Sequence, residues 1–175
     1  MFVKSVKMSK DIKDLQIIRL DPFRDHRGQI WTLYSEDLLD YSFVSDKISV
    51  SRFGVLRGLH GDTDTAKLIT CLSGQFQLAV VDARKSSETY GTVKTFILNE
   101  EVPTSILVPA GCLNGHLCLS DRCIFYYKWT KEYKNPEFQK TVSWNDPELN
   151  IKWALNSPII SERDSNGKKF KEINL

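Results

Sequence analysis

The chain has 175 residues, of which 41% are hydrophobic and 11% aromatic. A chain of this length buries roughly 70% of its unfolded surface on folding. This length and apolar content exclude a disordered protein. Its 24 Lys and Arg residues and 22 Asp and Glu residues leave a formal net charge of +2. We therefore expect no long-range field that would recruit nucleic acid or an anionic membrane, so any bound anion must be held by local contacts.

The first twenty residues lack the features of a targeting segment. Lysines at positions 4, 7, 10 and 13 interrupt the apolar stretch that a signal peptide needs. No later run of about 18 apolar residues is long enough to span a membrane. We therefore expect a cytoplasmic protein with no membrane partner.

Two strands and a helical turn are predicted before the main body of the fold. The strands cover residues 17–20 and 28–34 and are joined by a polar turn at residues 24–27. Ser35 is placed to cap a single helical turn over residues 35–41.

From residue 43 to residue 130, short β-branched and aromatic runs alternate with turn sequences, which is typical of an all-β sandwich or barrel. Eight strands at this spacing suit a double-sheet jelly roll. They are predicted at residues 43–50, 55–59, 67–72, 75–82, 93–98, 104–108, 115–119 and 123–129. The chain then becomes more polar, and we expect extended segments and short peripheral helices that wrap the barrel. No linker interrupts the sequence, so residues 1–175 are predicted to form one domain.

The four cysteines are Cys71, Cys112, Cys118 and Cys123. They form no C-x-x-C pair, and four cysteines in a chain of this size do not suggest a disulfide scaffold. We expect buried, reduced thiols that behave as small apolar residues. A zinc site built from the last three is the less favoured alternative, because their spacing is unusual for zinc.

His60 is the first candidate for chemistry. It ends a strand-like run and is followed by Gly61 and a polar loop, a position where an imidazole can accept a proton near neutral pH. A purely structural role is the alternative. Arg57 lies three residues earlier, so strand alternation places it on the opposite face from His60 unless the strand twists or bends there.

Other candidates have ordinary roles when they are considered singly. Tyr126 and Tyr127 are adjacent in a predicted strand, so one must point inward, where its phenol needs a hydrogen-bond partner. Asp164 is expected to be a solvated loop carboxylate. Arg27 and Arg57 are expected to be surface cations, and Lys67 the solvent-side tip of a strand.

A metal site is not expected. The histidines are His26, His60 and His116, they form no His-x-His pair, and Asp62 is the one carboxylate at a useful short spacing. A typical catalytic metal site needs about three protein ligands.

Taken together, short motifs in a fixed order resemble the dTDP-4-dehydrorhamnose 3,5-epimerase family. The resemblance runs from Asp21 to Asp164 and so covers most of the chain. The matching segments are Asp25-x-Arg27-Gly28, residues 54–60 (GVLRGLH), Lys67-Leu68, Gly74, residues 79–84 (AVVDAR), Thr89-Tyr90-Gly91, Val108-Pro109-Ala110-Gly111, Tyr127-Lys128, Trp144-Asn145-Asp146 and Ile151-Lys152-Trp153.

The resemblance implies a cupin-like jelly roll, a homodimer, and an enzyme that epimerises a nucleotide-linked 4-keto sugar with no metal or redox cofactor. The ketone at sugar carbon 4 acidifies the C–H bonds at carbons 3 and 5. A base on one face can then remove a proton while an acid on the other face returns one, which inverts the centre.

The resemblance also implies roles for individual residues. His60 matches the family's general base, and Asp164 matches the carboxylate that orients it. Tyr127 matches the acid on the opposite face. Lys67 matches a lysine near the keto oxygen, where a cation stabilises the enolate.

For the nucleotide, Arg27 and Arg57 match arginines that hold the diphosphate, since the planar guanidinium can pair with two phosphate oxygens. Phe23 matches an aromatic residue near the base. In the family an N-terminal strand crosses to the partner subunit, so the segment near Arg27 is expected to complete the neighbour's site.

Several positions around the expected substrate depart from the family pattern. Asn114 stands where the family has a second active-site histidine, and His116 follows on the same strand face. An amide can donate a hydrogen bond but cannot shuttle a proton. Lys47, Ser51 and Glu132 complete the predicted substrate-binding set, and Glu132 could pair with a guanine edge.

These departures most closely resemble the branch of the family that acts on GDP-linked 4-keto heptoses in capsular polysaccharide synthesis. Inversion at carbon 3 alone and at carbons 3 and 5 both remain open. The alternatives are the family's usual reaction on a dTDP-4-keto-6-deoxyhexose, a related keto-isomerase, a non-catalytic cupin that binds a sugar nucleotide, and a metal-dependent oxygenase.

Overall fold

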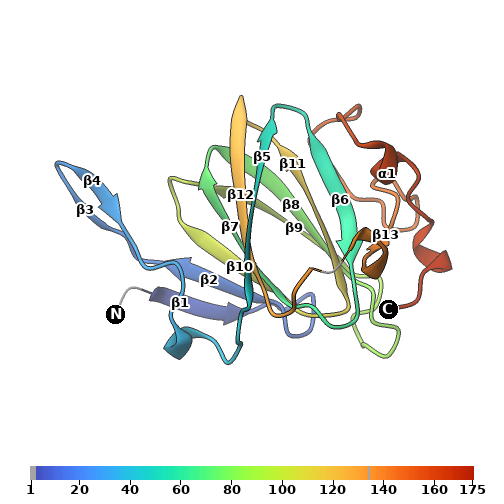
Figure 1. Ribbon diagram of the computed structural model, residues 1–175, viewed down its shortest axis with the longest axis horizontal. Coiled ribbons are helices and arrows are strands. Elements are labelled where there is room, and N and C mark those ends of the chain that lie inside the picture. Colours follow the sequence, from blue (N-terminus) through green and yellow to red (C-terminus); the bar gives the residue numbers. More distant parts are fainter. Residues whose placement is uncertain (1–2, 134) are drawn as a thin grey trace.

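The computed structural model describes residues 3–133 and 135–175, and two antiparallel sheets form its body (Figure 1). The six-stranded sheet has the order β1 (Val3–Met8), β2 (Gln16–Leu20), β10 (Thr104–Val108), β7 (Lys67–Ser73), β12 (Arg122–Trp129), β5 (Ser45–Arg52). The five-stranded sheet has the order β13 (Lys140–Thr141), β6 (Leu56–Gly61), β11 (Cys112–Cys118), β8 (Gln75–Asp82), β9 (Val93–Asn99). The predicted all-β, double-sheet architecture is confirmed.

The side chains of β8 show how the sheets pack. Phe76, Leu78 and Val80 point into a cluster that also contains apolar residues of β7, β10 and β12. Ala79 and Val81 point to the other face and pack under the C-terminal segment. Because successive side chains of a strand alternate between faces, one strand contributes to two cores, and its sequence is apolar at every position from Leu78 to Val81.

The chain after residue 135 wraps the outer face of the five-stranded sheet, as predicted (Figure 1). It contains α1 (Glu162–Ser165) and the 3-10 helices η2 (Pro136–Phe138) and η3 (Phe170–Glu172). Val142 exchanges two backbone hydrogen bonds with Leu59, and Ile159 accepts one from Leu56. These bonds hold α1 beside β6, where both contribute to the site described below.

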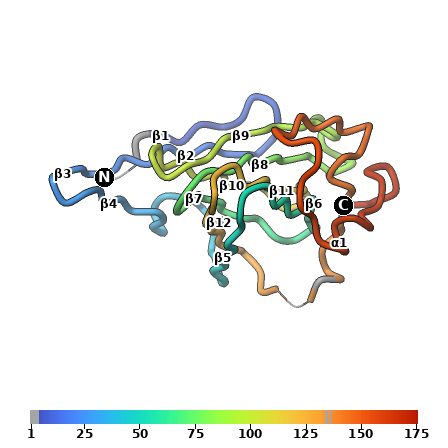
Figure 2. The backbone as a smooth tube through the Cα atoms, turned by 90° about the horizontal axis from the view of Figure 1, so that it is seen from above, coloured from blue at the N-terminus to red at the C-terminus, as the bar shows by residue number. Residues whose placement is uncertain are grey.

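The N-terminal region differs from the prediction. Residues Phe23–Asp25 (β3) and Gly28–Ile30 (β4) form a hairpin that projects from the body (Figures 1 and 2). The expected strand 28–34 therefore ends at Ile30, and the expected turn 24–27 shortens to two residues. The backbone N–H of Arg27 donates to the Asp25 side chain at 2.9 Å, a local bond that favours so tight a turn.

The sequence interpretation also missed a strand. β1 contains two of the lysines that argued against a signal peptide, and it forms one edge of the six-stranded sheet, with β5 at the other. Lysines on an edge strand discourage pairing with another chain. The predicted helical turn is present as the 3-10 helix η1 (Glu36–Leu38), with Ser35 at its N-cap, but the Ser35 side chain makes no capping hydrogen bond.

The four cysteines are buried free thiols, as predicted. Among the described residues there is no helix with the length and apolar character needed to cross a membrane.

Candidate active site

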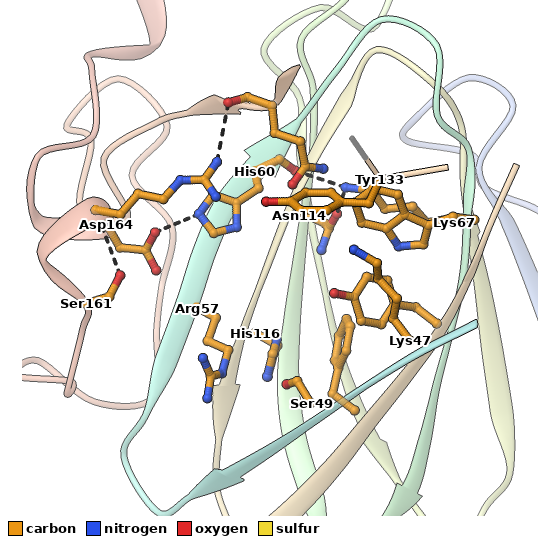
Figure 3. Close-up of a pocket in the computed structure, with 15 residues that line it drawn as sticks. Lys47, Ser49, Arg57, His60, Lys67, Asn114, His116, Tyr133, Ser161 and Asp164 are labelled. Carbon is orange, nitrogen blue, oxygen red and sulfur yellow. Dashed lines mark hydrogen bonds and ion pairs between the residues drawn. The ribbon is translucent and has the colours of Figure 1, made fainter. Parts of the chain in front are cut away.

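A cavity of about 380 Å³ opens between the two sheets (Figure 3). The six-stranded sheet contributes Lys47, Ser49, Lys67, Phe125, Tyr127 and Trp129. The five-stranded sheet contributes Arg57, His60, Asn114 and His116. Tyr133, Gln139, Ser161, Arg163 and Asp164 close the cavity from the C-terminal part of the chain.

Eight of the residues predicted to form the site line this cavity. They are Lys47, Arg57, His60, Lys67, Asn114, His116, Tyr127 and Asp164. The structure therefore brings together residues from two sheets and a C-terminal helix that the sequence interpretation connected through the family resemblance.

The other four predicted residues lie outside the cavity in this chain. Phe23 and Arg27 are on the projecting β3–β4 hairpin, where Arg27 pairs with Asp25. Ser51 is buried behind Arg57 and accepts a hydrogen bond from its Nε atom at 3.1 Å. Glu132 lines a neighbouring cavity of about 560 Å³.

His60 and Asp164 form a hydrogen-bonded pair. The Nε2 atom of His60 lies 2.6 Å from Oδ1 of Asp164. The other carboxylate oxygen accepts from the backbone N–H of Gly58, and the backbone N–H of Asp164 donates to Ser161 Oγ. Asp164 is 3% exposed, so it is not the solvated loop carboxylate expected when it was considered singly.

These contacts keep Asp164 ionised. Burial alone would raise the pKa of its carboxyl, but the hydrogen bond and charge of His60, together with the Gly58 and Ser161 contacts, hold the pKa below its usual range. An ionised carboxylate accepts a hydrogen bond from the N–H at His60 Nε2, which leaves Nδ1 of the neutral ring without a proton. The pair therefore has the form of a general base with an orienting carboxylate.

Arg57 and His60 line the same cavity, although their spacing predicts opposite faces. His60 pairs with Asn114 and Arg57 with His116, so three steps along β6 match two steps along β11. This extra residue is a β-bulge, which shifts the alternation of the strand. Gly58 lies inside it at φ +128°, and a Cβ atom there would be 2.5 Å from the Cα of Gly115.

Lys67 is buried in the cavity wall rather than at a solvent-side strand tip. Its Nζ atom donates to Asn114 Oδ1 at 2.8 Å and to the His60 carbonyl at 3.4 Å. Burial lowers the pKa of Lys67 to about 8, although the charge of Asp62 opposes the shift. Asn114 therefore orients an ammonium group that is close to its point of deprotonation.

Lys47 lies in contact with two aromatic rings at the same cavity. Its Nζ atom is 3.5 Å from the ring centre of Tyr133 and 4.3 Å from that of Trp129. Such contacts stabilise a cation on the face of a ring. Lys47 also lowers the pKa of Lys67 through its like charge, so the two ammonium groups share one site.

Tyr127 faces the cavity from β12, in the sheet opposite His60. Burial raises the pKa of its phenol, and Tyr133 adds to the shift, so the phenol keeps its proton at neutral pH. Its neighbour Tyr126 points to the outer face and donates to Asp46, which confirms the predicted alternation. A base on one sheet and a proton donor on the other thus face a common space.

The sequence interpretation missed seven of the lining residues. Ser49, Phe125 and Trp129 lie two positions from predicted site residues on the same strands, so strand alternation could have identified them. Tyr133, Gln139 and Ser161 come from irregular segments, and Arg163 comes from the short helix α1, so none of them lies in a stretch long enough to carry a periodic signal. Among the described residues, no three His, Cys, Asp or Glu side chains gather in a group suited to a metal ion.

Residues 9–172 match the family model for dTDP-4-dehydrorhamnose 3,5-epimerase. The chain belongs to this family. A dTDP-4-dehydrorhamnose 3,5-epimerase of Methanothermobacter thermautotrophicus is 37% identical over 166 residues, which cover 89% of each chain.

Two solved structures extend the match. The dTDP-4-dehydrorhamnose 3,5-epimerase of Elizabethkingia anophelis is 36% identical, covers 100% of both chains and superposes with a TM-score of 0.89. A dTDP-6-deoxy-D-glucose-3,5-epimerase of Legionella pneumophila, solved with dTDP-4-keto-L-rhamnose, is 31% identical with a TM-score of 0.90 and covers 97% of this chain and 94% of its own.

These findings confirm the predicted family, the jelly-roll fold and the class of enzyme, an isomerase of nucleotide sugars. They do not support the narrower prediction of a GDP-heptose branch in capsular polysaccharide synthesis. The relatives named above are dTDP-sugar epimerases, and they favour the alternative in which the nucleotide is dTDP.

Proposed function

We propose that this protein inverts carbons 3 and 5 of a dTDP-linked 4-keto-6-deoxyhexose. The observation that carries the proposal is the pairing of His60 with the buried Asp164 on one side of a cavity that Tyr127 lines from the opposite sheet. The names of the relatives and the dTDP-4-keto sugar bound to the Legionella protein support the choice of nucleotide and ketone.

The proposed reaction begins with His60. Its unprotonated ring nitrogen removes the proton from the carbon next to the ketone, and the electron pair moves to the carbon 4 oxygen to give an enolate. Asp164 stabilises the imidazolium that forms. The ammonium of Lys67 lies against Asn114, where it stabilises the negative charge that develops on the oxygen.

Tyr127 then completes the inversion. Its phenol donates a proton to the opposite face of the same carbon as the carbonyl re-forms. The His60 imidazolium then releases its proton to solvent and the Tyr127 phenolate takes one up, which restores both groups. Repeating the sequence at the second carbon inverts it as well. Since acid and base belong to different sheets, neither needs to move around the sugar ring.

Cations at the cavity are proposed to hold the diphosphate. Arg57 is fixed by Ser51 and the Val50 carbonyl, and Lys47 lies on the aromatic rings nearby. These two cations supply the local contacts by which a chain with a net charge of only +2 is expected to bind an anion.

Phe23 and Arg27 are proposed to act on the neighbouring subunit of a homodimer. Both lie on the hairpin that projects from the body (Figure 2), where Phe23 is 59% and Ile30 69% exposed. Exposed apolar side chains on a protruding element are typical of an interaction surface.

Mixing an Arg27→Ala variant with a His60→Asn variant should restore activity to some sites. If the mixture stays inactive and sedimentation shows a monomer, the homodimer proposal is wrong.

A GDP-linked 4-keto heptose remains the second candidate. Two residues favour it. Asn114 takes the place of the family's second histidine, and Glu132 lies in the cavity beside the sugar site. A carboxylate can accept two hydrogen bonds from a guanine edge.

One experiment tests the proposed function and separates these candidates. The protein is incubated in heavy water with dTDP-4-keto-6-deoxyglucose or a GDP-4-keto heptose, and NMR locates the deuterium. We expect incorporation at carbons 3 and 5 of the dTDP sugar. Exchange with the GDP sugar alone would reverse the order of the candidates, incorporation at carbon 3 alone would make the enzyme a 3-epimerase, and exchange with neither would refute both.

A further inference from the structure

A closed circuit of contacts connects the two residues of the His60–Asp164 pair. His60 lies opposite Thr141 in the pairing of β6 with β13. The Oγ1 atom of Thr141 accepts a hydrogen bond at 2.9 Å from Nε of Arg163, which is the residue before Asp164 on α1. Asp164 closes the circuit through its 2.6 Å contact with His60 Nε2 (Figure 3). A second route, through β13, therefore joins the two residues besides their own hydrogen bond.

Arg163 binds the segment around β13 through two nitrogens of its guanidinium group. Besides the Nε contact, its Nη2 atom donates to the backbone carbonyl of Gln139 at 3.4 Å, and Gln139 immediately precedes β13. A planar guanidinium that donates through two nitrogens fixes direction as well as distance. The two bonds therefore restrict rotation of α1 relative to β13 more than one bond would.

The helix α1 depends on such contacts because it is short. It contains four residues, and isolated helices of fewer than about 12 residues are marginal in water. Successive residues of a helix point about 100° apart, so Asp164 reaches β6 while Arg163 reaches β13. One helical turn thus contacts two strands that are themselves paired at His60.

Thr141 affects the proposed chemistry only through its neighbours. Among the residues that the structure describes, it lines neither the cavity between the sheets nor the adjoining one. Its hydroxyl therefore does not contact a substrate held in either space. Its contact with Arg163 does set the place of α1, and a shift of about 1 Å in a catalytic group can cost about 10²-fold in rate.

We propose that Arg163 is a positioning residue for the general base, and that it holds Asp164 against His60 by bonding to Thr141 and to the Gln139 carbonyl. The inference rests on the proposed function for the role of His60. When the bond to Thr141 is lost, α1 shifts on β13 and the carboxylate orients the imidazole less well. Proton removal then slows while affinity for the sugar nucleotide is kept.

Thr141 offers a matched pair of variants. Thr141→Val keeps the shape of the side chain and removes the acceptor, whereas Thr141→Ser keeps the acceptor. With dTDP-4-keto-6-deoxyglucose as substrate, we expect kcat to fall about 5- to 100-fold in Thr141→Val with little change in KM. Thr141→Ser should stay near the wild type. Glu162→Gln, an exposed change on the same helix, is the control and should match the wild type.

Variants of Arg163 separate positioning from substrate binding. Arg163 also lines the cavity, and its charge contributes to the lowered pKa of Lys67. Arg163→Lys keeps the charge but lacks the planar fork, so we expect it to lose kcat as Thr141→Val does. Because both changes break the same contact, the double variant should lose little more than either single variant. A raised KM with unchanged kcat in Arg163→Lys would make Arg163 a binding residue and overturn the inference.

Proton NMR of the free protein tests the positioning without a substrate. The Nε2 proton of His60, held in a short bond to a carboxylate, should resonate far downfield, and its absence in His60→Asn assigns it. It should move upfield or broaden in Thr141→Val and stay in place in Thr141→Ser. The inference is overturned if Thr141→Val keeps the wild-type kcat or leaves this resonance unmoved, or if Thr141→Ser is equally impaired. Absence of exchange with every sugar would refute the proposed function, while the resonance still decides whether Arg163 positions the pair.

Discussion

The Nε2 atom of His60 lies 2.6 Å from Oδ1 of Asp164, although 104 positions separate the two residues in the sequence. The C-terminal segment makes this contact possible because its backbone bonds to Leu56 and Leu59 hold it against β6. The pair joins a strand end to a buried helix N-terminal turn, and it supplies the base for the proposed chemistry.

Replacing Asp164 with Asn should reduce the rate of proton exchange by about 10²- to 10⁴-fold. The amide removes the negative charge that stabilises the imidazolium and orients the His60 ring. Stopped-flow or NMR measurement of deuterium incorporation gives the rate. Affinity for dTDP should change little, since Asp164 contacts His60 and Gly58 and not the proposed phosphate site. An unchanged exchange rate would show that Asp164 has no part in the reaction.

The pH dependence of activity should reflect Lys67. Its pKa is lowered to about 8 by burial, so the ammonium is lost as the pH rises through this value, and kcat should fall above about pH 8. Loss of this proton has the opposite effect on stability, which rises with pH while kcat falls. Between about pH 8 and 10.5 the unfolded chain binds the proton that the folded chain has lost, so the free energy of unfolding gains from this group as pH rises.

Lys67→Met provides the reference for that prediction. The difference in unfolding free energy between wild type and Lys67→Met, measured by urea titration at several pH values, should shift in favour of the wild type from pH 8 to pH 10.5. A flat difference over this range would mean that Lys67 titrates normally in the folded protein.

Two substitutions at Asn114 should shift the fall of kcat at high pH, which Lys67 sets, in opposite directions. Asn114→Asp places a negative charge where Oδ1 now accepts from Lys67 at 2.8 Å, which raises the Lys67 pKa and extends activity to higher pH. Asn114→Leu removes the acceptor and shifts the fall to lower pH. The profile of kcat against pH is the measurement, and an equal shift in both variants would indicate a merely structural residue.

Gly58→Ala should destabilise the fold more than Gly28→Ala does. Both glycines have φ +128°, but a Cβ at Gly28 meets nothing within 4 Å, whereas one at Gly58 would be 2.5 Å from Gly115 Cα. The backbone conformation costs each variant about 1–3 kcal/mol, and the steric clash adds to this at Gly58. Urea unfolding of both variants isolates the clash. Equal destabilisation would show that the bulge adjusts freely.

Much of the β-structure was predictable from the sequence. The strands at 75–82 and 104–108 match β8 and β10 at both ends, because apolar runs between clear turn sequences define them. Strand β11 begins at Cys112 rather than at residue 115, since Asn114 is an unusual residue inside a strand and Gly115, which the prediction includes, is another. Their presence there reflects the site, where Asn114 binds Lys67 and Gly115 lies against Gly58.

The site was harder to predict. Nothing in the spacing of His60 and Asp164 indicates that they meet, and the family resemblance alone connected them. The bulge that turns Arg57 into the cavity depends on the pairing of β6 with β11, which is a relationship between two strands. The lining residues Gln139 and Ser161 lie on irregular backbone, so no sequence period marks them.

In the proposed mechanism, His60 and Tyr127 serve opposite faces of one carbon. The most direct test is to follow both exchange and inversion by NMR in heavy water for wild type, His60→Asn and Tyr127→Phe. We expect deuterium with inversion in the wild type and no exchange in His60→Asn. In Tyr127→Phe, His60 should return deuterium to the face it came from, giving exchange without inversion. Inversion at the wild-type rate in Tyr127→Phe, or exchange at the wild-type rate in His60→Asn, would show that this mechanism is wrong.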